Sequence, residues 1–239
     1  MLKLHKQSIR QIARLWWRTG LDLIYPPICV GCNQPGEIWC SDCHGCIQVF
    51  REPMCLRCGR PSHHSLVQCR YCRGFPSTLK VRSYAKYEGS LLRALLHLKY
   101  QPNQDLANIM GHWLADVFQR TGWSGSILVA VPLGKHRIRQ RGYNQAGLIA
   151  DGLADVLGLE NSRTALRRIR ETRSQVGLDP TARFQNVLDA FVADEHVVRG
   201  QEIILIDDLM TTGSTLSACT FALEDAGAKR VYGLTVARA

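Results

Sequence analysis

Residues 203–215 read IILIDDLMTTGST, and this stretch decides the fold. Its first four residues are apolar and predict a buried strand, which Asp207 and Asp208 follow directly. A turn of hydroxyl residues and one glycine comes next, and residues 214–225 are predicted to form a helix. A strand followed by a turn and a helix is the repeating unit of α/β proteins. Because open α/β sheets bind ligands at the carboxyl ends of their strands, we expect a ligand site at this turn.

The residue types at the turn indicate a sugar phosphate as the ligand. Asp207 and Asp208 can accept hydrogen bonds from ribose hydroxyls or hold the hydration shell of Mg²⁺. Hydroxyl side chains and backbone N–H groups at the start of a helix suit a phosphate monoester. The residues of this cradle are Thr211, Thr212, Gly213, Ser214 and Thr215. A Walker A loop is excluded because it requires a lysine here, and receiver domains lack the hydroxyl-rich turn.

The α/β pattern extends over residues 79–239. Strands are predicted over 80–87, 127–131, 203–206 and 231–236, and helices over 91–98, 106–118, 144–157 and 214–225. Strands that alternate with helices imply a mostly parallel sheet flanked by helices on both faces. With 46% hydrophobic and 21% charged residues, the chain has the balance of a globular protein.

Nine of the ten cysteines fall between residues 29 and 72, within a predicted zinc-ribbon-like module over 28–78. They form four CxxC pairs, a spacing that aims two thiolates at one metal ion. The predicted ligands are Cys29, Cys32, Cys40, Cys43, Cys55, Cys58, Cys69 and Cys72. One or two structural zinc ions are expected, and an iron–sulfur cluster is the alternative. The pairs can be used in sequence or cross-braced, and Cys46 and Cys219 are expected to be buried thiols.

Residues 1–27 are predicted to form a basic amphipathic helix that docks on the protein, binds a membrane surface or contacts nucleic acid. No stretch is apolar for long enough to span a membrane, and the N-terminus is a poor secretory signal, so we expect a cytoplasmic location. The net charge is +10, and ten of the 30 basic but only four of the 20 acidic residues precede residue 79. This bias favours anionic partners.

Residues 203–215 resemble the phosphoribosyl pyrophosphate signature of type I phosphoribosyltransferases. The resemblance implies that Asp207 and Asp208 are catalytic and engage the ribose, and that the hydroxyl turn holds the 5′-phosphate. Two further segments resemble the family's pyrophosphate loop and mobile loop: VPLGKHRIRQRGYNQA (131–146), and the region from LRRIRETRSQVGL (166–178) to Arg183 and Asn186. The other residues expected to contact phosphoribosyl pyrophosphate are Lys99, Leu133, Gly134, Arg137 and Arg141.

Taken together, the cysteine pairs, the RGYNQA segment and the DDLMTTGST signature resemble the ComF family, on its GntX-like branch, from residue 29 onward. The resemblance implies a part in natural competence and the use of imported DNA. Two functions are compatible with it. The first is a Mg²⁺-dependent phosphoribosyltransferase with an unknown acceptor. The second is a non-catalytic accessory of DNA uptake that binds single-stranded DNA or a translocation partner and uses the ribosyl site as a metabolite sensor.

Overall fold

The computed structural model describes residues 26–76, 78–170 and 189–239. The predicted N-terminal helix therefore lies outside the described residues, as do Arg183, Asn186 and most of the predicted mobile loop. Among the described residues, no helix combines the length and the apolar character that a membrane span requires.

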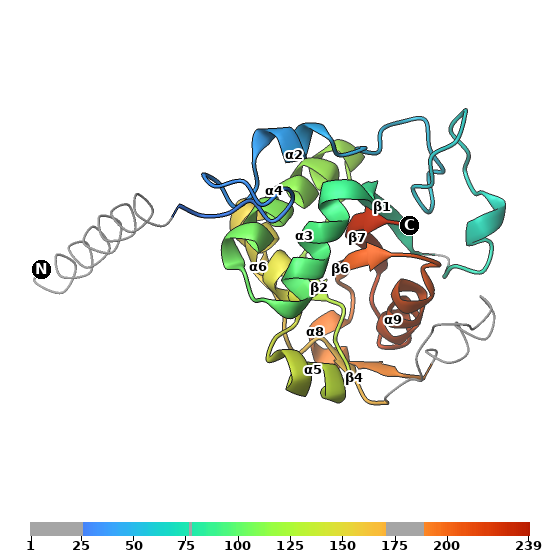
Figure 1. Cartoon of the computed structure of the whole chain (residues 1–239). Helices are drawn as coiled ribbons and strands as arrows, with labels where there is room; N and C mark the ends of the chain where they lie inside the picture. The colour runs from blue at the N-terminus through green and yellow to red at the C-terminus, as the bar shows by residue number, and fades with distance from the viewer. Residues whose placement is uncertain (1–25, 77, 171–188) are drawn as a thin grey trace, which may run out of the picture.

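A five-stranded parallel sheet forms the centre of the molecule (Figure 1). Its strands lie side by side in the order β1 (Lys80–Lys86), β7 (Arg230–Arg238), β6 (Glu202–Met210), β2 (Ile127–Ala130) and β3 (Glu160–Asn161). All four neighbouring pairs are parallel, as the alternation of strands and helices predicts. Parallel neighbours bring the carboxyl ends of β2 and β6 to one edge of the sheet, where the ligand site is expected.

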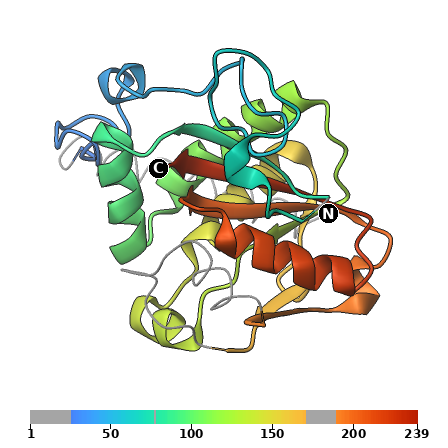
Figure 2. The ribbon, with the colours of Figure 1, turned by 90° about the vertical axis from the view of Figure 1, so that its right-hand side faces the viewer.

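Both faces of the sheet are covered. α3 (Gly89–Tyr100), α4 (Gln104–Thr121) and α6 (Gln145–Leu157) pack on the face that presents Ile204 and Ile206. α9 (Ser214–Asp225) packs on the opposite face, against Ile203 and Leu205, and Figure 2 shows this helix running along its side of the sheet. The strict alternation of these four residues between the two cores follows from the two-residue repeat of a strand.

The remaining elements are short. α5 (Lys135–Arg141) follows β2, and α8 (Glu195–Val198) precedes β6. β4 (Leu166–Arg168) and β5 (Phe191–Ala193) form a separate antiparallel pair. In the cysteine-rich module, α2 (Ser41–Gly45) and the 3₁₀ turn η1 (Arg70–Cys72) are the only described helical segments.

The cysteine-rich module packs directly on the α/β domain. Trp39 lies edge-on to Trp113 of α4, with 5.5 Å between ring centroids, and Trp113 in turn stacks on Tyr84 of β1 at 4.9 Å. Cys29, Trp39 and Cys43 belong to the same buried cluster as α3, α4 and α6. The module has too few apolar residues to build a core of its own, and it shares the core of the α/β domain instead.

Candidate functional site

β6 extends four residues further than the sequence predicts. The apolar pattern indicated an end at Ile206, but the strand continues through both aspartates to Met210. The reason is β7, which is also longer than expected and pairs Thr235 with Asp207 and Arg238 with Met210. Because successive residues of a strand face opposite sides, the two carboxylates leave the sheet in different directions.

Asp208 faces the side of the sheet that α3 and α6 cover. It is buried, and its Oδ2 lies 3.3 Å from Nζ of Lys99 and 3.4 Å from Nε2 of Gln145. Lys99 comes from the last turn of α3 and Gln145 from the first residue of α6. Three elements that are far apart in sequence thus meet at one carboxylate, and the sequence predicted neither the ion pair with Lys99 nor the contact with Gln145.

Asp207 lies toward α9. Burial raises the pKa of its carboxyl well above the usual range, and the charge of Asp208 raises it further. One of its oxygens accepts the backbone N–H of Asp208 at 2.9 Å.

Burial also raises the pKa of the Cys219 thiol on α9, and the charge of Asp207 adds to this effect. Cys219 is therefore the inert buried thiol that the sequence predicted, whereas Cys46 is exposed and that prediction is wrong.

The two carboxylates are suited to a hard cation or to ribose hydroxyls. Like charges on adjacent residues in a desolvated place are unfavourable, and a divalent ion or hydrogen-bond donors would offset that repulsion. Both groups offer only oxygen atoms, the ligand type that Mg²⁺ takes in proteins. The donor set therefore fits Mg²⁺.

The hydroxyl turn lies between β6 and α9, as predicted. Oγ1 of Thr212 is 2.8 Å from Oγ of Ser214 and accepts the Ser214 backbone N–H at 3.3 Å. Gly213 has φ of +82°, a conformation that glycine adopts without strain. Thr212 and Thr215 are half-buried and Thr211 is exposed. A ligand can therefore reach their hydroxyls and the N-terminal N–H groups of α9 at the same time. This is an anion-binding arrangement.

A phenylalanine of the cysteine-rich module packs against this turn, a contact that the sequence analysis missed. A Cβ added to Gly213 would stand 2.4 Å from Cζ of Phe75 and 2.7 Å from Cε of Met210. Phe75 is held there by Arg57, whose Nη2 donates to the carbonyls of Phe75 at 2.7 Å and Pro76 at 2.6 Å. No local sequence pattern signals such a contact, because the two segments meet only in the folded chain.

The arginine-rich segment after β2 forms the short helix α5, whereas the family resemblance implied a loop there. Gly134 is its N-cap residue, and Leu133 precedes it. Arg137 and Arg141 are one turn apart and share a face, whereas Arg139 points elsewhere. Arg141 donates to Oε1 of Gln145 at 3.0 Å and so connects to the Asp208 cluster.

Arg137 is exposed, and no contact joins it to the other described site residues. The segment after α5 is anchored on both sides: Tyr143 donates its hydroxyl proton to the carbonyl of Leu98 at 2.7 Å, and Asn144 donates to that of Val131 at 2.9 Å.

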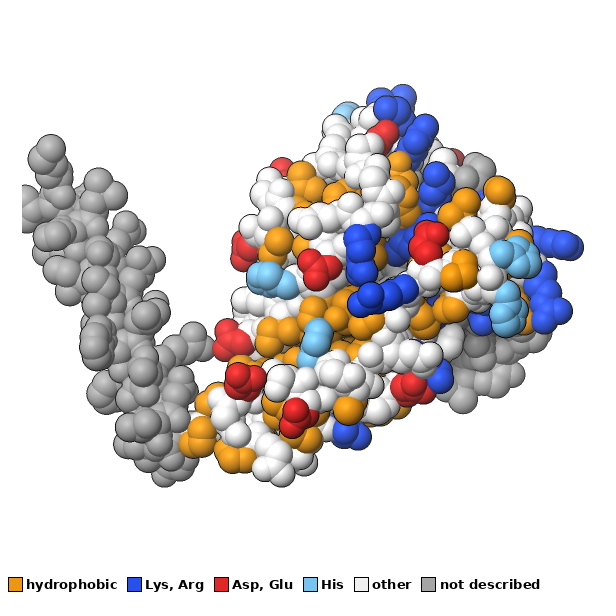
Figure 3. Space-filling view, turned by 90° about the horizontal axis from the view of Figure 1, so that it is seen from above, with side chains coloured by type: hydrophobic (Ala, Val, Ile, Leu, Met, Phe, Trp, Pro, Cys, Tyr) orange, Lys and Arg blue, Asp and Glu red, His pale blue; other side chains and the backbone are white. Residues whose placement is uncertain are grey.

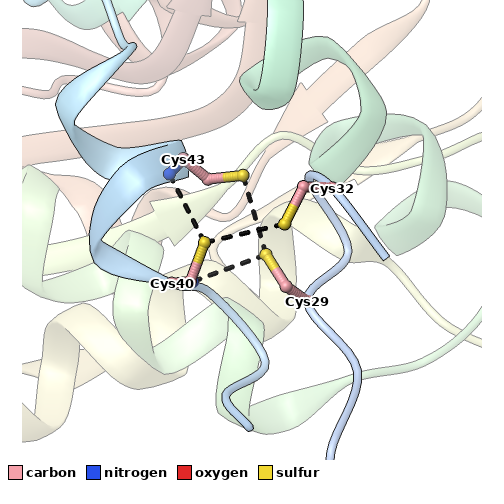
Figure 4. A group of neighbouring side chains, drawn as sticks. All are labelled: Cys29, Cys32, Cys40 and Cys43. Carbon is pink, nitrogen blue, oxygen red and sulfur yellow. Dashed lines mark hydrogen bonds between the residues drawn. The ribbon is translucent and has the colours of Figure 1, made fainter. Parts of the chain in front are cut away.

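The cysteines form two separate groups of four, in sequence order. The first cysteine site contains Cys29, Cys32, Cys40 and Cys43, and the second contains Cys55, Cys58, Cys69 and Cys72. Within each site all four sulfur atoms lie within 4.8 Å of one another. Figure 4 shows the first site, with two sulfurs from the chain before α2 and two from its N-terminal end. The cross-braced alternative is excluded.

Sulfur–sulfur distances fit one tetrahedral ion in each site. They are 3.7 Å for Cys29–Cys43 and Cys32–Cys40. In the second site they are 3.8 Å for Cys55–Cys72 and 3.5 Å for Cys58–Cys69. A tetrahedron with Zn–S bonds of about 2.3 Å has edges of about 3.8 Å. Although burial opposes ionisation, backbone N–H groups, that of Cys40 first, lower the pKa of Cys29 to about 6, whereas burial and the neighbouring cysteines raise the pKa of Cys43. A bound cation would stabilise the thiolate form of all four.

The second cysteine site is bound to the sheet through a buried arginine. Arg238, at the end of β7, donates to the carbonyl oxygen of Cys58, and its Nη2 lies 3.9 Å from the Cys58 sulfur. Its side chain is 4% exposed. An arginine here supplies the charge that offsets a thiolate cluster with net negative charge. Arg238 also pairs with Met210 in the β6–β7 ladder. The Met210 side chain lies beside Gly213 of the hydroxyl turn.

Comparisons with known proteins agree with both halves of this architecture. Residues 20–73 match the model of the double zinc ribbon domain, and residues 99–238 match that of the phosphoribosyl transferase domain. The DNA utilization protein YhgH of Salmonella typhi is 29% identical over 219 residues, which cover 87% of this chain and 96% of that protein. Competence protein F of Haemophilus influenzae is 26% identical, over 84% and 96%. Competence protein ComFC of Bacillus subtilis is 28% identical, over 86% of each.

Proposed function

The chain belongs to the phosphoribosyl transferase domain family, and on that premise we propose that it binds phosphoribosyl pyrophosphate and Mg²⁺ and transfers the ribosyl phosphate to an acceptor. The observation that carries this proposal is the meeting of Asp208, Lys99 and Gln145 beside the hydroxyl turn. A buried carboxylate, a lysine and a phosphate cradle at one sheet edge match the three parts of this substrate: ribose, pyrophosphate and 5′-phosphate.

Each group of residues takes one part of the substrate. The hydroxyl turn, residues 211–215, holds the 5′-phosphate at the start of α9. Asp207 and Asp208 accept hydrogen bonds from the ribose hydroxyls, and their charge stabilises the positive charge that develops on the sugar ring. Lys99 and the α5 arginines Arg137 and Arg141 face the pyrophosphate, which they attract as charge-assisted donors.

The reaction exchanges one bond at the anomeric carbon. The bond to pyrophosphate breaks with its electron pair on the leaving oxygen, and the nucleophilic atom of the acceptor bonds to the anomeric carbon and releases its proton. Asp207 and Asp208 would hold Mg²⁺, which would neutralise negative charge on the pyrophosphate.

The test combines binding and turnover. Calorimetry with phosphoribosyl pyrophosphate and Mg²⁺ is expected to give saturable binding that Lys99→Met and Asp208→Asn weaken. Asp155→Asn, at an exposed position of α6, is the matched control and is expected to bind normally. Pyrophosphate release is then measured with nucleobases, amines and short DNA as acceptors. Asp208→Asn is expected to lower the rate at least about a hundredfold. Wild-type affinity and rate in Asp208→Asn contradict the assignment.

A second function is favoured by the surface and by the names of the relatives. Those relatives are a DNA utilization protein and two competence proteins. In addition, lysines and arginines form a band across the face seen in Figure 3, on a chain of net charge +10. On this hypothesis the chain is a non-catalytic accessory of DNA uptake, which binds single-stranded DNA or a translocation partner and senses phosphoribosyl pyrophosphate.

The two functions differ in measurable ways. Binding of phosphoribosyl pyrophosphate without pyrophosphate release, across all acceptors, favours the sensor. Affinity for single-stranded DNA is expected to fall steeply with salt, because lysine and arginine contacts release counterions. DNA affinity that does not change with salt contradicts an electrostatic contact through this band.

A further inference from the structure

A hollow lies between the two cysteine sites, on the outer edge of the sheet. The segment between the two cysteine sites, residues 44–54, pairs with β1 on one side of the hollow, where Phe50 donates its N–H to the carbonyl of Tyr84 at 2.8 Å. On the other side, Val81 of β1 donates its N–H to the carbonyl of Arg57 at 2.7 Å. Between these two hydrogen bonds lie two residues of β1, Arg82 and Ser83, but six residues of the chain that pairs with it. Residues 51–56 therefore bulge away from β1 and form an arch. The arch, the β1 edge and the end of α4 enclose a pocket of about 370 Å³.

Three arginines from three different elements line this pocket. Arg51 comes from the arch, Arg82 from β1 and Arg120 from α4. The lining contains one carboxylate, Glu52, whose Oε2 accepts the hydroxyl proton of Ser65 at 3.3 Å. Within the described parts of the chain, none of the three arginines forms an ion pair. The pocket therefore has a net positive charge, because its three arginines face the single carboxylate of Glu52.

Arg82 is held in place and still has free donors. Its Nη1 donates to the carbonyls of Leu56 at 3.0 Å and Val81 at 2.8 Å, and its guanidinium carbon lies 5.3 Å from the ring centroid of Trp123. No described residue accepts a hydrogen bond from its Nε or Nη2. The Arg82 side chain is half-buried, and burial lowers its pKa, while the nearby charge of Glu52 acts in the opposite direction. A fixed, desolvated cation with unused donors is stabilised by an anion.

The remaining walls suit an organic group. Phe50, Met54 and Val117 are apolar lining residues, and Thr121 adds a hydroxyl. The volume falls within the range of about 300–1,000 Å³ that is typical of small-molecule sites. A nucleic-acid strand would require a groove with phosphate contacts at regular intervals, whereas these three arginines line a single pocket.

We propose that this pocket binds a small phosphorylated molecule of nucleotide size, with its phosphate on Arg51, Arg82 and Arg120 and its apolar part against Phe50 and Met54. None of the lining residues belongs to the phosphoribosyl site. The pocket is therefore a second ligand site, built where the cysteine-rich module meets the α/β domain.

The test uses AMP as the probe and the full-length, zinc-loaded chain carrying Thr215→Glu. That change places a carboxylate in the hydroxyl turn, so that phosphate binding there is blocked and only the second site is measured. Calorimetry at physiological salt is expected to show one saturable site per chain. Arg51→Gln and Arg120→Gln, both at exposed positions, are each expected to weaken binding at least about tenfold, the effect of losing a charge-assisted hydrogen bond. Arg199→Gln removes an exposed arginine elsewhere and is the charge-matched control.

Three results would overturn the proposal. They are absence of AMP binding in the Thr215→Glu chain, equal affinity in the pocket variants and the control, or binding of a short oligothymidine that depends on Arg51 and Arg120 while AMP does not bind. The last result would assign the surface to single-stranded nucleic acid. A parallel titration of the chain without Thr215→Glu, which is expected to show a further site, separates this pocket from the phosphoribosyl site.

Discussion

Substituting Gly213 by alanine tests the contact between the cysteine-rich module and the phosphate cradle. Two costs are expected. The first is conformational, because alanine at φ of +82° enters the left-handed region, at about 1–2 kcal/mol. The second is steric, because the new Cβ would stand 2.4 Å from Phe75 and 2.7 Å from Met210. Overpacking of this kind costs about 1–3 kcal/mol. We expect Gly213→Ala to lower the free energy of unfolding by about 2–5 kcal/mol.

A second glycine separates these two costs. Gly142 has φ of +79°, and a Cβ placed on it meets nothing within 4 Å. Gly142→Ala therefore has only the conformational cost, about 1–2 kcal/mol. Urea unfolding of both variants in the presence of zinc gives the steric cost as their difference.

A double-mutant cycle identifies the partner. In a Phe75→Ala background the ring is absent and Met210 is flexible, so Gly213→Ala is expected to cost about as much as Gly142→Ala. The coupling free energy between Phe75 and Gly213 is therefore expected to be about 1–3 kcal/mol. Equal costs for the two glycine variants, or zero coupling, would refute the contact between Phe75 and the turn.

Three further predictions concern the metal sites and the aspartate pair. Metal analysis of the purified chain is expected to find two zinc ions; Cys29→Ser and Cys55→Ser should each lose one and keep the other, and loss of both ions from either variant would contradict separate sites. Arg238→Met is expected to weaken metal retention at the second cysteine site by about 10–100-fold in a chelator competition, and unchanged retention would argue against a role for its charge. Because the pKa of Asp207 is raised on folding, its stabilising contribution is complete below the unfolded pKa of about 4 and is lost as pH rises through the folded value. Asp207→Asn should therefore remove this decline and exceed the wild type in stability at neutral pH, whereas parallel stability–pH curves would contradict the shift.

Local patterns in the sequence predict most of the fold. The helix over residues 214–225 begins and ends where predicted, and the hydroxyl turn that precedes it marks its start. The end of β6 was predicted wrongly because two aspartates usually mark the end of a buried strand, whereas here β7 continues the ladder beyond them. β3 has only two residues, too few for a periodic signal.

In the candidate site, too, the sequence predicts what local patterns determine and misses what tertiary packing brings together. The sequence places the aspartates and the hydroxyl turn side by side because they are neighbours along the chain. Lys99 was predicted to contact phosphate, but its ion pair with Asp208 joins α3 to β6 and required the structure. The order of the cysteine sites was open for a similar reason, because CxxC spacing fixes each pair and leaves the partner pair undetermined. Phe75 and Gln145 were missed because tertiary packing alone brings them to the site.

The buried position of Arg238 sets an order of assembly. Both cysteine sites precede every strand of the sheet along the chain, and each closes a short loop, so a nascent chain can load its metal early. The surface that receives the second site, however, includes β7, which enters between β1 and β6 after all other strands have been synthesised. Until then Arg238 cannot bind Cys58, and the second site has only its contacts with earlier elements, such as the hydrogen bond from Val81 of β1 to Arg57. A chain arrested before β7 should therefore hold its metal but be prone to aggregation.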